Sequence, residues 1–234
     1  MATRKKGLWE SVYYAIVQSK TLTVHTFTYL PEERVHIDRI LNAFLTAAGM
    51  TRLRNNLAYC VHELAGNAKK ANIKRLYFRE KELDILDAAD YQKGMETFKT
   101  ETTEQFPRFL SLLRENGLYV KFQFRKLRKG VRVTIRNNSL LAPAELQRIQ
   151  DKVAVARRYR CLADAYSTTE DGSEGAGLGI VMMLFMLRNL GFSHDAFSIR
   201  ISGSETVATL VLVPSQESGV EDGLAAAAAR MNAS

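Results

Sequence analysis

The sequence predicts an α+β fold: a two-layer α/β sandwich in which one mostly antiparallel mixed sheet carries helices on one face. Two observations lead to this prediction. Apolar residues recur at helical spacing through most of residues 31–117, whereas residues 118–136 and 196–214 alternate apolar and polar side chains around a turn. Runs of helix followed by antiparallel strand pairs are typical of a sheet whose helices are segregated to one side.

The first elements are bounded by turn and capping signals. Residues 1–21 are expected to form a short helical extension, and residues 22–30 a strand that Pro31 ends. The helix that follows has Gly49 as its C-terminal cap, and a second helix runs from about Arg52 to at least Ala71. These segments supply two helices for one face of the sheet.

The rest of the chain continues the same pattern. The stretch at about 76–117 is acidic and mostly helical, so we expect a helical insert within a domain that spans residues 22–214. A basic turn ending at Gly130 joins the first strand pair, and a buried apolar helix precedes the second. Residues 215–234, with their run of alanines, predict a flexible tail.

The composition indicates a soluble protein with a core of its own. The chain has 234 residues, of which 46% are hydrophobic and 25% charged, and no apolar run approaches the roughly 20 residues of a membrane span. The basic N-terminus is followed by only a short, interrupted apolar stretch, so we expect no signal peptide. Cys60 and Cys161 do not have metal-binding spacing. We therefore expect a cytoplasmic protein with no membrane partner.

The net charge of +8 is unevenly distributed. Residues 118–136 carry seven Lys or Arg and no acid, whereas residues 80–104 carry eight acids against three Lys. A basic balance favours phosphate-bearing partners. Because most of the basic residues alternate along a strand pair, where outward Lys and Arg are ordinary solvated side chains, the sequence disfavours nucleic acid as the partner.

One helix carries a polar cluster beside its apolar stripe. In "HELAGNAKKA", Glu63, Asn67 and Lys70 group roughly 110° from the centre of that stripe, and His62 lies on the other flank. An Asn carbonyl oxygen suits Mg²⁺, a Lys can meet a phosphate, and a carboxylate can orient or deprotonate a nucleophile. The alternative is a half-exposed helix with unrelated polar residues, because short motifs recur by chance.

A second stretch brings glycines to the start of a helix. "EGAGLGI" places Gly175, Gly177 and Gly179 directly before the apolar helix "IVMMLFMLRNLG". Glycines at such a position let backbone N–H groups approach a phosphate at the positive end of the helix dipole. The alternative is a flexible hinge into a buried helix.

Together these stretches resemble the GHKL ATPase superfamily, which includes histidine-kinase catalytic domains and anti-sigma serine kinases. "HELAGNAKKA" is similar to the family's N-box, "GAGLGI" to its second glycine box and "GSETVATLVLVP" to its closing strand. The order of the elements is most similar to the anti-sigma serine-kinase branch. The resemblance implies a Bergerat-type ATP-binding fold with ATP and Mg²⁺ as cofactors.

The resemblance also implies roles for individual residues. Carried over by position, it makes Glu63 the general base or water-orienting acid, Asn67 the Mg²⁺ ligand and Lys70 a phosphate contact. It places Gly175, Gly177 and Gly179 at the hinge of an ATP lid, close to the phosphates. It places Thr206 near the adenine pocket.

The first glycine box departs from the family pattern D-x-G-x-G. At "NNSLLAPAEL" the Asp is replaced by Asn137, and the two glycines by Ser139 and Leu141. The family's Asp accepts a hydrogen bond from the adenine amino group. Asn137 can still accept through its carbonyl oxygen, without the charge-assisted strength. We expect ATP to be held more weakly, by about 1–2 kcal/mol.

The function implied is that of a small regulatory protein kinase or anti-sigma-like switch, which transfers the ATP γ-phosphate to a bacterial partner protein. A homodimer is left open. One alternative is a degenerate, non-catalytic protein-binding module, which the altered glycine box favours. A second is a nucleic-acid-associated ATPase, which the charge of residues 118–136 favours. The intact Glu63, Asn67 and Lys70 favour the kinase.

Overall fold

The computed structural model describes residues 7–159 and 178–214, and these form an α+β sandwich of one five-stranded sheet and a layer of helices. Gly175, Gly177 and the expected tail at 215–234 lie outside the described residues. The helices are α1 Leu8–Val17, α2 Pro31–Ala47, α3 Arg54–Glu80, α4 Ala88–Glu104, α5 Phe106–Glu115, α6 Pro143–Arg158 and α8 Leu178–Asn189. The strands are β1 Leu22–Thr26, β2 Val120–Leu127, β3 Gly130–Asn137, β4 Phe197–Ser202 and β5 Glu205–Leu212.

The sheet has the strand order β1-β2-β3-β5-β4. Both predicted strand pairs are present, β2 with β3 and β4 with β5. The sequence predicts a mostly antiparallel mixed sheet, and in the structure every pair among the five described strands is antiparallel. No crossover of the βαβ type joins neighbouring described strands, so no parallel pair arises.

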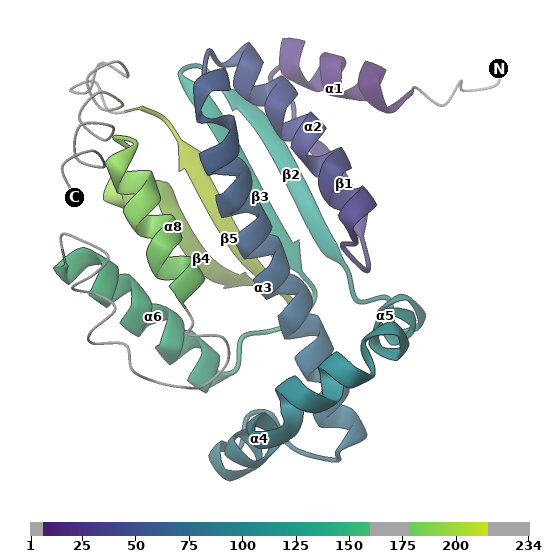
Figure 1. Cartoon of the computed structure of the whole chain (residues 1–234). Helices are drawn as coiled ribbons and strands as arrows, with labels where there is room; N and C mark the ends of the chain where they lie inside the picture. Colours follow the sequence, from purple (N-terminus) through teal and green to yellow (C-terminus); the bar gives the residue numbers. More distant parts are fainter. Residues whose placement is uncertain (1–6, 160–177, 215–234) are drawn as a thin grey trace.

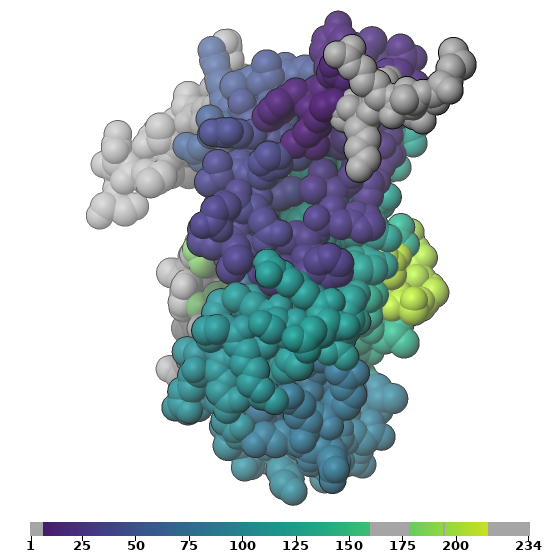
Figure 2. Space-filling model, turned by 90° about the vertical axis from the view of Figure 1, so that its right-hand side faces the viewer, coloured from purple at the N-terminus to yellow at the C-terminus, as the bar shows by residue number. Residues whose placement is uncertain are grey.

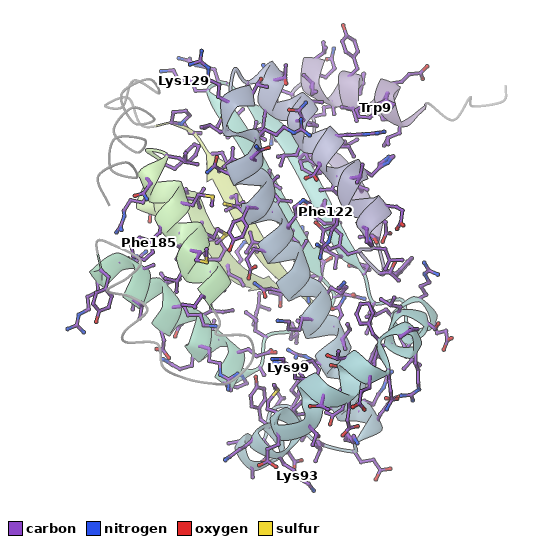
Figure 3. The ribbon with its side chains drawn as sticks, viewed as in Figure 1. Trp9, Lys93, Lys99, Phe122, Lys129 and Phe185 are labelled. Carbon is purple, nitrogen blue, oxygen red and sulfur yellow. The ribbon has the colours of Figure 1, made fainter. Side chains whose placement is uncertain are left out.

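The helices α2, α3 and α8 cross one face of this sheet, and α6 lies beside α8 (Figure 1). The core lies between the two layers. Phe122 of β2, which Figure 3 labels at this interface, is fully buried, as are Leu57 and Val61 of α3. Alternation along each strand sends every second side chain into this core. The core therefore holds α3 firmly across the middle of the sheet.

The segment 1–21, expected to be an extension, contributes to the same core. Val12 and Ala15 of α1 are buried in the main cluster. The opposite face of α1 leaves Trp9 and Tyr13 exposed. The extension is thus packed onto the sandwich rather than detached from it.

The insert forms a second, smaller core at the far end of α3. The sequence predicts that this helix reaches at least Ala71, and it continues to Glu80, beyond the ends of the strands (Figure 1). Its last turns pack Tyr77 and Phe78 against α4 and α5. The helix ends where Glu82 takes a left-handed backbone conformation, and Asp87 then caps α4 through its side chain.

Among the described helices, none combines the length and the apolar character that a membrane crossing requires.

Candidate functional site

Glu63 and Asn67 lie one turn apart on α3, on its side toward α8. The Asn67 side-chain amide donates a hydrogen bond to Glu63 Oε1, with 3.0 Å between the heavy atoms. Both side chains are half-buried. Because the Asn67 nitrogen faces the carboxylate, its carbonyl oxygen is left as an acceptor that points elsewhere.

Gly179, in the first turn of α8, touches this pair. A Cβ built on Gly179 would fall well inside 3.0 Å of the Glu63 carboxylate, closer than real Cβ atoms approach any neighbour. Only glycine therefore fits here without a shift of the helix or of Glu63. The structure thus brings together two motifs that are far apart in the sequence, at the N-terminal end of α8.

Lys70 is placed differently from its two partners. It lies one turn beyond Asn67 and is exposed, without an ion pair to any described residue. Its neighbour Lys69 is half-buried and lies over the Phe106 ring at 5.2 Å. Burial, and secondarily the charge of Arg34, lower the pKa of Lys69. Sequence reasoning did not single out Lys69, because nothing in its spacing separates it from a surface lysine.

The residues expected near adenine meet at the ends of two strands. Asn137, the last residue of β3, is directly opposite Thr206 of β5 in the sheet register. Ser139 follows two residues later, and its backbone carbonyl accepts a hydrogen bond from Thr206 Oγ1 at 2.6 Å. All three residues are at most 6% exposed.

Asn72 of α3 completes this group, and the sequence analysis missed it. Its Oδ1 accepts hydrogen bonds from Asn137 Nδ2 at 3.2 Å and from Ser139 Oγ at 2.7 Å, and its Nδ2 donates to the Tyr119 carbonyl at 3.0 Å. Asn72 is completely buried. It falls on the apolar stripe of α3, four residues after Ala68. An amide among core-facing residues indicates a buried hydrogen-bond partner, and this pattern could have identified Asn72 from the sequence.

This network determines which way the Asn137 amide points. The two hydrogens of Asn137 Nδ2 face Asn72 Oδ1 and, at 3.4 Å, the Ser139 carbonyl. The Asn137 carbonyl oxygen accepts no bond within the network. A single orientation of the amide is favoured, with the acceptor outward.

The loop after β3 is held by the next turn of α3. Arg75 donates to the Leu140 carbonyl and pairs with Glu145 at 2.6 Å, and Lys74 approaches the same carboxylate at 3.3 Å. Burial by itself would raise the pKa of Glu145, but the hydrogen bond and charge of Arg75, with the charge of Lys74, lower it overall. Ion pairs thus hold this loop where the family pattern has glycines.

The two halves of the candidate site share one helix. Glu63 and Asn72 are nine residues apart on α3, which places them roughly 14 Å apart along its axis at 1.5 Å per residue. His62 faces away from both, as expected: its Nδ1 meets Tyr29 and its Nε2 lies 2.8 Å from Asp38. A cavity of about 220 Å³ between α6, α8 and β4 is lined by none of the predicted site residues.

Comparison with known proteins finds no matching family model and no matching solved structure. The chain is similar to an uncharacterized protein of Treponema pallidum (strain Nichols), with 37% identity over 203 residues. The match covers 87% of this chain and 40% of the relative, so the chain spans about two fifths of that protein's length. The function must therefore be inferred from the site itself.

Proposed function

We propose that this chain binds Mg-ATP between α3 and the start of α8 and acts as a small regulatory protein kinase or anti-sigma-like switch on a bacterial partner protein. The observation that supports the proposal is the contact of Gly179 with Glu63, beside Asn67. A helix N-terminus opened by glycine, next to a carboxylate and an amide, suits a phosphate chain with its metal ion.

The donor set is compatible with Mg²⁺. The Asn67 carbonyl oxygen is free to face a metal because the amide nitrogen is bonded to Glu63. A bound Mg²⁺ would neutralise phosphate charge, while Glu63 would orient the acceptor hydroxyl of the partner. Lys70, exposed one turn further on, is available as a point charge for phosphate.

The orientation of the Asn137 amide suits the adenine base of ATP. Its outward carbonyl oxygen can accept a hydrogen bond from an amino group, such as that of adenine, and cannot donate to an oxo group in the same position. The replacement of the family's Asp therefore weakens the contact without reversing its polarity.

A second candidate, the non-catalytic protein-binding module, is favoured by a different observation. Asn72, Asn137, Ser139 and Thr206 already satisfy most of one another's hydrogen bonds in a nearly closed network. A network that is satisfied without a ligand also serves as a structural support.

Calorimetric titration with ATP and Mg²⁺ separates the two. We expect saturable binding that weakens at least tenfold in Asn67→Ala and is unchanged in Asn55→Ala, an exposed Asn on the same helix. Absence of heat and of a thermal shift at millimolar nucleotide would refute the ATP site and leave the protein-binding module.

A further inference from the structure

The face of the sheet that points away from the helices collects basic side chains from four strands. In the sheet register, His25, Lys121, Arg136, Val207 and Arg200 form one row across all five strands. Arg125 and Arg132 lie opposite each other further along β2 and β3. Their neighbours in sequence, such as Phe122 and Val133, are buried under the helices, so alternation directs these basic side chains to the other face.

We define this open face by its five cations: Lys121, Arg125, Arg132, Arg136 and Arg200. The helices lie on the opposite side, and Figure 2 shows the yellow strands β4 and β5 at one edge with α2 on the other side of the molecule. Arg125, Arg132 and Arg200 are exposed. Lys129, at the turn between β2 and β3, extends the positive charge at one end (Figure 3).

The positive charge of the open face is only partly compensated. Glu205 is the one acid within the five described strands, and it is shared by Lys121 at 2.8 Å and Arg136 at 2.6 Å. Arg132 and Arg200 form no hydrogen bond or ion pair with a described residue. These guanidinium groups are therefore free to meet an anionic partner.

An aromatic pair lies at the β1 end of the basic row. The rings of His25 and Tyr119 stack with their centroids 5.5 Å apart and an interplanar angle of 23°, and the Lys121 ammonium group lies 4.9 Å from the Tyr119 centroid. His25 is exposed. Aromatic rings beside cations form the platforms on which unpaired bases stack. A row of hydroxyl and amide side chains (Thr23, Gln123, Thr134, Thr209 and Ser198) runs parallel to the basic row.

We propose that the open face binds single-stranded nucleic acid, with its phosphates on the arginines and a base against His25. The sequence alone disfavours such a partner, but the stacked His25–Tyr119 pair and the free Arg132 and Arg200 are seen only in the structure. A five-stranded sheet is too broad for a duplex major groove, which admits a helix or a two-stranded ribbon. A single strand can lie flat across the face with its bases exposed to the rings. The surface is on the opposite side of the sheet from α3 and α8, so it does not depend on the ATP site.

The test is fluorescence anisotropy of the full chain with a labelled 16-nucleotide single-stranded RNA. We expect Arg132→Glu combined with Arg200→Glu to weaken binding at least tenfold and to flatten the salt dependence, by about 0.7 in log–log slope for each phosphate that a cation no longer neutralises. The matched control is Arg52→Glu with Arg54→Glu, which makes the same change of charge on exposed residues elsewhere. Equal weakening in both pairs, or no binding at 50 mM salt, would overturn the proposal.

Two further measurements distinguish a single strand from an acidic protein. His25→Ala should weaken binding about fivefold or more because a base can no longer stack on the ring, whereas Tyr13→Ala, at an exposed aromatic on α1, should not. Polyglutamate of similar charge should compete poorly. Equal competition by polyglutamate, or full affinity in His25→Ala, would assign the open face to an acidic protein surface instead.

Discussion

The region where α3 crosses the sheet and the region where it packs against the insert differ in how their polar side chains are hydrogen-bonded. Over the sheet, Asn67 of α3 and Asn137 of β3 each donate through the amide nitrogen to another side chain, and their carbonyl oxygens accept no hydrogen bond from a described residue. In the insert, Tyr77 bonds to Thr97 and Lys74 bonds to Tyr91, so polar groups close on one another. Under the proposed function, the free acceptors over the sheet would serve the ligand, and the mutual hydrogen bonds at the insert would support the fold.

The two regions meet at residues 72–75. Asn72 holds the end of β3, and Lys74 and Arg75 hold the loop beyond it through Glu145. Five predictions sharpen this comparison.

The largest loss of stability is expected at Glu145, whose ion pairs join the two regions. Glu145→Gln leaves Lys74 and Arg75 without their counter-charge, and we expect a decrease of about 3 kcal/mol in the free energy of unfolding. Urea denaturation measures it. Glu80→Gln, which breaks the more exposed pair with Arg108, should cost less than about 1 kcal/mol.

The stability difference between wild type and Glu145→Gln should depend on pH. The folded-state pKa of Glu145 is lowered, so its contribution is present above the ordinary carboxyl pKa and is lost as pH falls through the folded value. The stability difference between wild type and Glu145→Gln should therefore shrink below about pH 4. A difference that stays constant down to pH 3 would contradict the ion pair.

The next effect concerns the contact between α3 and α8. Gly179→Ala places a Cβ where the Glu63 carboxylate lies, so that carboxylate, the end of a flexible side chain, must move away; we expect little change in stability but at least tenfold weaker Mg-ATP binding. Gly66→Ala is the matched control, because a Cβ there meets nothing within 4 Å and helix propensity should leave stability unchanged or higher. Thermal melts and titration calorimetry measure both. Equal behaviour of the two variants would refute the contact.

A more specific effect is expected at Asn72. Asn72→Leu removes the acceptor that orients Asn137 and should cost about 1–3 kcal/mol of stability. Because the Asn137 amide can then turn, the preference for ATP over GTP should fall as well. Competition titrations with the two nucleotides check this. A preserved preference would show that Asn72 supports the fold alone.

The last prediction concerns the reactivity of the buried Cys60 thiol. Burial raises the pKa of the Cys60 thiol to about 12, so this side chain should resist alkylation at pH 8 in the folded protein and react after urea unfolding. Peptide mapping by mass spectrometry reads the labelling of Cys60. Rapid labelling of the folded chain would show that the core around α3 opens easily.

The fold class, the two strand pairs and the helical character of the insert follow from the sequence alone. Local periodicity carries this information, because the spacing of apolar residues is set by the geometry of one element at a time. The same spacing placed Glu63, Asn67 and Lys70 on one side of α3, and it correctly separated His62 from them.

Which segments lie against one another is visible only in the packed structure. Three features of the structure join segments that are distant in the sequence. Gly179 contacts Glu63, Asn72 orients Asn137, and arginines from different strands gather on the open face. Strand order and register set these neighbours, and no local pattern encodes them. An amide on an apolar stripe marks a buried partner, but only the packed sheet shows which partner it is.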